Sequence, residues 1–403
     1  MIIVGGTYTE VCLEPQWEQI FGSGFRAVNL ILENFPTTQV DYFTCADQEV
    51  KAHLDYYVKN YPNFKFLSSE IFQSPGFYYD HPLKTPIIFP RPDLYRNIDI
   101  TLKASGKNIL AYGLLESNIQ VEGEYVVYDP QSPVNPIPFS KTGSKAEKLI
   151  TIINKSEATV IVGSRDISKI RDHFFQIEKC HALIVKMGPQ GAFVFEDSSS
   201  DPIIIPVFRT QSVWPIGSGD VFSAFFAASW FQGESISKSA LLASQATAIY
   251  CNSKSLTIGD QLEKSSLIPL ETKDTPKGKV YIAGPFFTFS QRWLINEIRD
   301  ALKSSGLKTF SPFHDVGHGR AKDVVDKDLK GLNESEIVLA VIDGLDSGTL
   351  FEVGYAISKG IKVIAFVQNE SEESLKMLEG TGCIIEEDFT TAIYKTFWEL
   401  ASK

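Results

Sequence analysis

Two carboxylates stand six residues apart in a short glycine-containing stretch near the C-terminus. The stretch reads Asp346-Ser347-Gly348-Thr349-Leu350-Phe351-Glu352 and follows an apolar run at residues 337–342. This pattern predicts a turn between a strand and a helix, with Glu352 on the turn. A carboxylate placed there can act as a nucleophile or stabilise a developing positive charge, and a second acidic group can transfer protons. Glu352 is therefore a candidate catalytic residue, and Asp346 is a candidate to contact the substrate.

The segments that position these carboxylates are expected to be parallel strands. Residues 280–283 are apolar and precede Gly284-Pro285, which predicts a strand ending in a tight turn. Residues 337–342 predict a second strand whose exit loop carries the two carboxylates. Because ligands bind at the carboxyl edge of open parallel sheets, both exits should serve one crevice.

Together with Tyr281-Ile282-Ala283-Gly284-Pro285-Phe286, the carboxylate stretch resembles the nucleoside 2-deoxyribosyltransferase family, over about residues 279–400. The resemblance implies that this part breaks or exchanges the bond between a nucleobase and its sugar, without a cofactor. It implies that Glu352 is the nucleophile and that Asp328 hydrogen-bonds the nucleobase. The other expected contacts with substrate are Asp346, Tyr281, Gly284, Phe286 and the loop Ser311-Pro312-Phe313-His314.

Several alternatives stay open for this site. Members of the family differ in whether the sugar passes to another base or to water. A nucleoside monophosphate would need a site for its 5′-phosphate, which Ser347 and Gly348 can supply at the start of a helix. A glutamate near a helix N-terminus is also often only a partner of the helix dipole. Asp328 lies in a charged segment, residues 322–330, of the kind that usually faces solvent.

A second constellation lies in the N-terminal part. Ile216-Gly217-Ser218-Gly219-Asp220 opens an apolar helical stretch, and Lys186-Met187-Gly188-Pro189-Gln190-Gly191 reads as a strand end and turn. Glycines at a helix start let backbone N–H groups approach an anion, and an aspartate there can accept a hydroxyl proton. The two stretches resemble the ribokinase-like (PfkB) family of sugar and nucleoside kinases, over about residues 1–253.

The resemblance implies a kinase that uses ATP and Mg²⁺ to phosphorylate a sugar or nucleoside hydroxyl, with Asp220 as the base. The residues expected to hold ATP and the transferred phosphoryl group are Gly217, Ser218, Gly219, Lys186, Gly188 and Gly191. Gly22 and Gly24, which begin a helix, are expected to contact the acceptor sugar. The family's acceptor-binding asparagine is replaced by Arg26, which would select an acceptor bearing a carboxylate or a phosphate.

Further departures from the family leave two interpretations open. Trp214-Pro215 replaces the usual Asp-Thr before the glycine-rich loop. An Asn-x-x-Glu motif of the magnesium network should follow a strand expected at residues 159–162, where the chain reads Gly163-Ser164-Arg165-Asp166. Asn154-Lys155-Ser156-Glu157 precedes that strand and is interpreted as coincidence. The N-terminal part is therefore either an active kinase or a ligand-binding kinase fold without catalysis.

Alternating strand-like and helical segments predict an α/β fold in two domains. We expect a ribokinase-like α/β sandwich over residues 1–253, a Ser-, Thr-, Lys- and Pro-rich linker over 254–278 with the boundary near residue 275, and a smaller Rossmann-like or flavodoxin-like parallel domain over 279–403. Further strands are expected at residues 125–129, 182–186 and 362–367.

Composition limits the partners of this 403-residue chain. A formal net charge of -11 argues against nucleic-acid binding, and the absence of a long apolar run argues against a membrane span. Five scattered cysteines, and a start that reads as a strand rather than a signal peptide, favour the reducing cytoplasm. His314 and His318 are spaced i, i+4, but Gly317 and Gly319 argue against a helix there, so a metal site is not expected. The partners expected from the resemblances are nucleosides, nucleotides, sugars and a second copy of the chain.

Overall fold

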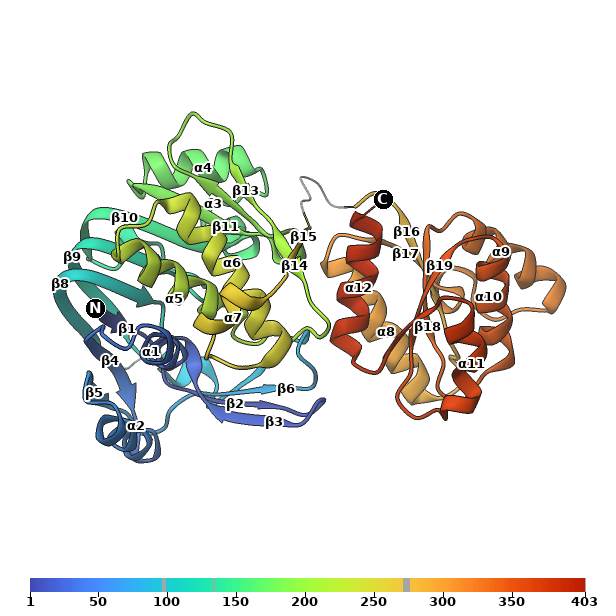
Figure 1. Ribbon diagram of the computed structural model, residues 1–403, viewed down its shortest axis with the longest axis horizontal. Helices are drawn as coiled ribbons and strands as arrows, with labels where there is room; N and C mark the ends of the chain where they lie inside the picture. Colours follow the sequence, from blue (N-terminus) through green and yellow to red (C-terminus); the bar gives the residue numbers. More distant parts are fainter. Residues whose placement is uncertain (96–98, 133–134, 271–275, 403) are drawn as a thin grey trace. The chain divides into compact units, whose positions relative to one another are not determined.

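The computed structural model describes residues 1–95, 99–132, 135–270 and 276–402. It forms two compact units, Met1–Thr210 with Trp214–Glu271, and Gln211–Val213 with Thr272–Lys403 (Figure 1). Both units are α/β, as predicted. The boundary expected near residue 275 lies outside the described residues. Two elements, α7 (Gly259–Lys264) and β15 (Ile268–Leu270), lie within the stretch expected to be a linker.

The larger unit is built on a mainly parallel sheet, which has nine strands in the part of the chain described. In sheet order the strands are β13 (Ile203–Ile205), β12 (Ala192–Phe195), β11 (Ala182–Lys186), β10 (Lys145–Asn154), β9 (Asn118–Asp129), β8 (Thr101–Tyr112), β1 (Ile2–Val4), β4 (Val40–Ala46) and β5 (Phe64–Glu70). Only the pairs that involve β12 are antiparallel among these neighbours. The strands expected at residues 125–129 and 182–186 are confirmed.

Helices cover both faces of this sheet because successive strand residues point to opposite sides. Leu110 and Tyr112 enter one core, and Ile109 and Ala111 enter the other. The first core holds the buried side chains of α1 (Gly22–Asn34), α2 (Gln48–Asn60), α5 (Ser218–Phe231) and α6 (Ile236–Ser253). The second core holds those of α3 (Lys155–Val162) and α4 (Ile167–Gln176).

The strand expected at residues 159–162 is wrong, because this segment belongs to helix α3. Its β-branched residues suggested a strand, but the preceding residues form a helix start. Asn154 accepts a hydrogen bond from the Glu157 backbone N–H, and Glu157 accepts one from the Asn154 backbone N–H. This reciprocal capping box fixes the helix N-terminus. The strand before it is β10, which ends at Asn154.

Two smaller sheets complete the larger unit. One has the order β3 (Trp17–Ile20), β2 (Thr9–Cys12), β6 (Gly76–Tyr79) and β7 (Ile87–Phe89). The other pairs β14 (Val207–Arg209) with β15 in antiparallel fashion. The first sheet matters for the site because β2 carries Glu10.

The smaller unit contains a fully parallel sheet, five-stranded in the described residues. Its order is β17 (Lys308–Phe310), β16 (Lys279–Ala283), β18 (Ile337–Val341), β19 (Lys362–Phe366) and β20 (Ile384–Glu386). Counted from the unit's first strand this is 2-1-3-4-5, the flavodoxin-like order. The strands expected at residues 280–283, 337–342 and 362–367 are confirmed to within one residue.

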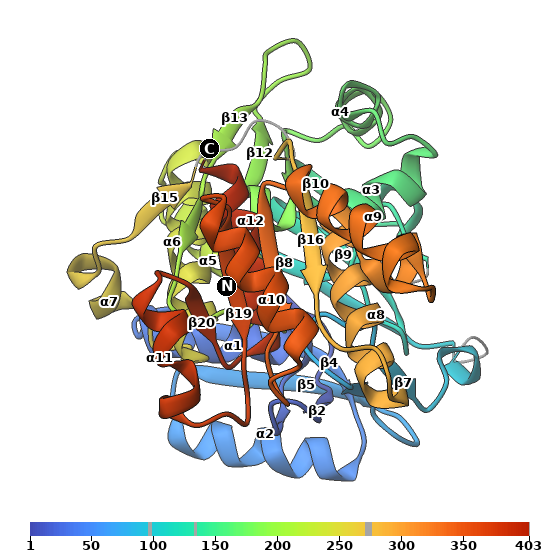
Figure 2. The ribbon, with the colours of Figure 1, turned by 90° about the vertical axis from the view of Figure 1, so that its right-hand side faces the viewer.

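Helices flank this second sheet on both faces (Figure 1 and Figure 2). One side carries α9 (Ala321–Asn333), α10 (Ser347–Ser358) and α11 (Glu372–Gly380), which share a core with Tyr281 and Ala283. The other carries α8 (Phe289–Ser304) and α12 (Phe389–Ala401). No helix in the described part of the chain is both long and apolar enough to span a bilayer.

Candidate active sites

The C-terminal candidate residues lie around the exits of β16 and β18. In the 2-1-3-4-5 order these two strands flank the point where the chain direction across the sheet reverses, which is where ligands bind in such folds. Gly284 and Phe286 follow β16 directly, and Asp346 follows β18 as the N-cap of α10. The two exits therefore come together as the sequence predicts.

Glu352 is the central carboxylate of this site. It lies in the second turn of α10, one turn further along the helix than the predicted position on the strand-to-helix turn. The buried Tyr281 hydroxyl donates a hydrogen bond to Glu352 Oε1 at 2.6 Å. Burial raises the pKa of Glu352 to about 7, with Asp328 and Asp346 adding repulsion and the Tyr281 hydrogen bond acting in the opposite direction. A raised pKa is common for groups that act in catalysis.

Asp328 and Asp346 stand beside Glu352 but differ in their surroundings. Asp328 Oδ1 is buried and has no hydrogen-bond partner among the described residues, and burial raises the pKa of this carboxyl. Asp328 is therefore half-buried, with one carboxylate oxygen shielded from solvent. Asp346 Oδ2 accepts hydrogen bonds from the Thr349 backbone N–H at 2.8 Å and from its hydroxyl at 2.9 Å. This oxygen of Asp346 is thus occupied in capping α10.

Aromatic side chains gather at the β16 exit. Phe286 stacks on Phe313 with ring centroids 5.4 Å apart and also contacts His318 at 5.8 Å. His314 instead bonds with Asn296 Oδ1 at 2.7 Å and with the Ser311 hydroxyl. Ser347 and Gly348 are exposed at the start of α10. Phe286 thus offers a flat apolar surface, whereas His314 is engaged in local packing.

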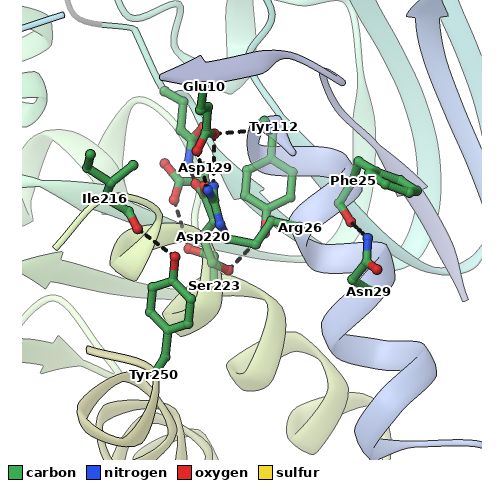
Figure 3. Close-up of polar contacts among 12 residues, drawn as sticks. Glu10, Phe25, Arg26, Asn29, Tyr112, Asp129, Ile216, Asp220, Ser223 and Tyr250 are labelled. Atoms are coloured by element: carbon green, nitrogen blue, oxygen red, sulfur yellow. Dashed lines mark hydrogen bonds and ion pairs between the residues drawn. The ribbon is translucent and has the colours of Figure 1, made fainter. Parts of the chain in front are cut away.

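The N-terminal candidate base, Asp220, lies in the first turn of α5 and is 8% exposed. Its Oδ2 accepts a hydrogen bond from Arg26 Nη1 at 2.6 Å, and its Oδ1 accepts one from the Gln131 amide. The Tyr112 hydroxyl donates to the Asp220 backbone carbonyl at 3.2 Å. Figure 3 shows Asp220 and Arg26 facing each other within this cluster. Both carboxylate oxygens of Asp220 are therefore occupied by other side chains.

Arg26 is 1% exposed and joins two carboxylates. Its Nη1 also donates to Glu10 Oε1 at 3.1 Å, and its Nη2 forms an ion pair with Glu10 Oε2. Burial raises the pKa of Glu10, opposed by the attraction of Arg26. Gly217 has a left-handed φ of 77°, and a side chain there would overlap the guanidinium. Arg26 therefore lies against the glycine expected to help form the anion hole.

The two glycines expected to contact the acceptor also have internal partners. The Gly22 backbone N–H donates to Glu10 Oε1 at 3.0 Å, and the Gly24 N–H donates to the Gly6 carbonyl at 3.1 Å. The start of α1 is thus tied to β2 and to the chain that follows β1. Glu10, Arg26, Gln131 and Asp220, the buried cluster that results, are called the acceptor-side cluster below.

A cavity of about 130 Å³ lies beside the start of α5. Its lining includes five of the six residues expected to hold ATP, namely Lys186, Gly188, Gly191, Ser218 and Gly219, together with Phe208, Phe222 and Thr247. The sixth, Gly217, contacts Arg26 instead. The mixture of apolar side chains, glycines and a helix N-terminus suits a base and a phosphate group.

Lys186 brings a positive charge to this cavity. Its Nζ bonds with Asp129 Oδ2 at 2.7 Å, and the Ser223 hydroxyl donates to the same oxygen at 2.7 Å. A side chain at Gly219 would lie 3.2 Å from Lys186 Nζ, so the ammonium group stands at the start of α5. The cation and the helix N-terminus would both favour an anion there.

The reason for interpreting Asn154-Lys155-Ser156-Glu157 as coincidence is wrong, because this stretch lies at the end of a strand and not before one. Asn154 ends strand β10, and Glu157 lies in the first turn of α3, which begins at Lys155. Burial and the nearby Asp129 raise the pKa of Glu157 to about 7, opposed by the attraction of Lys186. The error arose from placing the strand at residues 159–162.

In the described residues no group of three or more His, Cys, Asp or Glu side chains could hold a metal ion. Asp129 and Glu157 instead face Lys186.

Two members of the acceptor-side cluster are absent from the sequence expectations. Glu10 lies on a short strand, and no spacing rule links it to Arg26 or Asp220. Gln131 directly follows β9 and Pro130. The rule that strand exits in parallel sheets carry ligand-binding side chains could have identified Gln131.

Comparisons with known proteins divide the chain in the same way. Residues 125–262 match the model of the pfkB family carbohydrate kinases, and residues 280–390 match that of the nucleoside 2-deoxyribosyltransferases. Among curated proteins, the chain is similar to the uncharacterised protein UU063 of Ureaplasma parvum serovar 3, at 31% identity over 102 residues. That match spans 21% of this chain and 65% of the relative, just under two thirds of its length.

Three solved structures are similar to part of this chain. Ribokinase from Thermotoga maritima gives a TM-score of 0.47 at 15% identity, covering 65% of this chain and 97% of that one. The nucleoside kinase of Methanocaldococcus jannaschii gives 0.46 at 15% identity, covering 65% and 97%. Ribokinase from Giardia lamblia gives 0.47 at 13% identity, covering 66% and 99%.

Proposed function

We propose that this chain, which joins a pfkB-family segment to a nucleoside 2-deoxyribosyltransferase-family segment, is a bifunctional enzyme of nucleoside metabolism. Its C-terminal unit would cleave or exchange the N-glycosidic bond of a nucleoside or nucleoside monophosphate. Its N-terminal unit would phosphorylate a sugar or nucleoside hydroxyl with ATP. The observation that carries the first activity is the partly buried Glu352 held by Tyr281 beside Asp328.

In the C-terminal unit, Glu352 acts as the nucleophile. The Tyr281 hydroxyl holds Oε1, which leaves Oε2 to attack the anomeric carbon. The bond from that carbon to the base nitrogen breaks, and a glycosyl ester forms on Glu352. The Asp328 carboxylate hydrogen-bonds the departing base, which takes up its proton from solvent. Phe286 packs against the base, and water or a second base then releases the sugar.

Product analysis tests this activity. The full chain is incubated with nucleosides and nucleoside monophosphates, with and without a free acceptor base, and the products are identified by mass spectrometry. We expect a free base in every productive reaction and an exchanged nucleoside only if the enzyme is a transferase. Glu352→Ala should abolish base release, whereas Glu379→Ala, at an exposed position on α11, should not. Normal base release by Glu352→Ala would refute the assignment.

The second activity is supported by the cavity at the start of α5. ATP, when bound, supplies the phosphoryl group that is transferred. Lys186, Ser218 and Gly219 would hold its negative charge, because an ammonium group and a helix N-terminus meet there. Asp220 would take the proton of the acceptor hydroxyl once its oxygens are released by Arg26 and Gln131.

The alternative for the N-terminal unit is a ligand-binding fold without catalysis, which the occupied oxygens of Asp220 favour. ATP turnover with a panel of sugars, nucleosides and their phosphates separates the two. A phosphorylated product that disappears in Asp220→Asn supports the kinase. ATP binding without any product, beside intact base release, supports the non-catalytic fold.

A further inference from the structure

The acceptor-side cluster holds one cation between two acids inside the larger unit. Arg26 Nη1 is shared between Glu10 Oε1 and Asp220 Oδ2, and Nη2 pairs with Glu10 Oε2. A hydroxyl brought to Asp220 would meet a carboxylate that is already paired. The candidate base is therefore closed to an acceptor as long as Arg26 stays on it.

Arg26 also has an unused donor. Its Nε is buried and has no hydrogen-bond partner in the described part of the chain, although the residue is only 1% exposed. A buried N–H without a partner is costly, and structures normally satisfy it with protein, water or ligand. A guanidinium presents its donors in a planar fork that matches the oxygens of phosphate and carboxylate groups.

We infer that the phosphoryl acceptor of the N-terminal unit itself carries a phosphate or carboxylate group, and that Arg26 recognises this group. The inference rests on the proposed kinase function and names its substrate class. The anion accepts the free Nε donor and supplies a replacement negative charge, so Arg26 keeps a counter-charge when its Nη1 donor leaves Asp220. A neutral acceptor offers no replacement charge and leaves the ion pair in place.

Once Asp220 is released, it can act as the base in phosphoryl transfer. The acceptor hydroxyl gives its proton to Asp220, and its oxygen forms the new bond to phosphorus. The bond from that phosphorus to the bridging oxygen of the nucleoside diphosphate breaks. The position of the guanidinium against Gly217 places the recognised anion near the start of α5. A sugar phosphate, which cleavage of a nucleoside monophosphate would release, belongs to this substrate class.

Binding measurements on the full chain test the recognition step. Ribose and ribose 5-phosphate differ only in the anion, and calorimetry with each should give at least 10-fold tighter binding of ribose 5-phosphate. Arg26→Gln should remove most of that preference. Arg171→Gln, on the opposite side of the sheet in α4, is the matched control and should bind both as the wild type does. Equal binding of the two sugars, or an unchanged preference in Arg26→Gln, would overturn the inference.

A second variant separates recognition from folding. Arg26→Gln leaves Glu10 and Asp220 without their cation, so Glu10→Gln/Arg26→Gln, which removes one charge of each sign, is compared with it by thermal melting. A folded double variant that still prefers ribose 5-phosphate would also contradict a role for Arg26. Measurements of ATP turnover show whether a failure concerns the proposed kinase activity or the inference about Arg26. Arg26-dependent binding with no product refutes the kinase alone, whereas efficient phosphorylation of neutral sugars refutes the inference alone.

Discussion

The two candidate carboxylates of this chain sit in opposite electrostatic settings. Glu352 has a neutral phenol as its hydrogen-bond partner and two further acids nearby. Asp220 has a buried guanidinium on one oxygen and an amide on the other. Both are acids in the first two turns of a helix that follows a glycine-containing loop, so their local sequences look alike. Their surroundings nevertheless differ: among the described residues Glu352 has no cation beside it, whereas Asp220 is held in a buried ion pair.

The surroundings of a carboxylate determine whether it is ready to act as a nucleophile or a base. A carboxylate without a cation in a dry site is poorly solvated in its charged form, which raises its pKa and its reactivity as a nucleophile. A carboxylate in a buried ion pair keeps its charge but has no free oxygen, so it must exchange partners before it can act. We therefore expect the C-terminal site to work as it stands, and the N-terminal site to require a ligand that releases Asp220.

The largest effect should come from Glu352→Gln. The amide keeps the shape and can still accept the Tyr281 hydrogen bond, but it cannot form a stable ester with the sugar. Base release should fall by about 10³-fold or more, while ATP binding stays unchanged. Chromatography of free base over time gives the rate. A loss smaller than 10-fold would show that the two acids do not differ in the way proposed.

Asp220→Asn should have the next largest effect, on the other reaction only. Loss of the general base should lower phosphoryl transfer by about 10²–10⁴-fold and leave base release as in the wild type. A coupled assay of ADP formation with ribose 5-phosphate as acceptor measures it. If Asp220→Asn also abolished base release, the two centres could not be treated as independent.

The spatial arrangement of the C-terminal candidate residues could be predicted because their motif is local. Glu352 and Asp346 are six residues apart, and Tyr281 precedes a turn with a readable pattern, so strand exits alone bring them together. The capping of α10 by Asp346 and the unpartnered oxygen of Asp328 were not predictable, because both depend on the position of a helix.

The acceptor-side cluster could not be predicted for the same physical reason. Asp220 and Arg26 are 194 residues apart, and no pattern in the chain marks them as an ion pair. The strand wrongly expected at residues 159–162 shows a limit of predicting secondary structure from residue propensity. Its β-branched side chains favour a strand, but the capping box of Asn154 and Glu157 starts a helix there. Tertiary and capping contacts outweighed propensity.

The pH dependence of base release sharpens the comparison. Attack requires the ionised form of Glu352, and its pKa is raised to about 7. The value of kcat/KM should therefore rise with pH through a midpoint near 7. Asp328→Asn removes a negative charge that raises this pKa, so the midpoint should move to lower pH, although the maximal rate also falls. A midpoint below 5 in the wild type would mean that Glu352 is better solvated than its burial indicates.

The smallest effects concern stability, and their signs should differ between the two sites. The pKa of Glu352 is about 7 in the folded chain against an ordinary value of 4.5, so the folded state favours the protonated form. The wild type should lose stability as the pH rises from about 4.5 to about 7, by about 3 kcal/mol at most. Glu352→Gln does not titrate, so its advantage should grow over that window and persist above it.

Asp220→Asn should instead destabilise the larger unit at neutral pH, because Arg26 then keeps only Glu10 as a buried counter-charge. The expected loss is about 1–3 kcal/mol, below the cost of removing the last partner of a buried cation. Calorimetric melts of both variants at pH 5 and pH 8, with the two units assigned to separate transitions where they melt apart, give the values. Stabilisation by both substitutions would remove the contrast, since it would mean that the Arg26–Asp220 pair costs stability just as the lone Glu352 does.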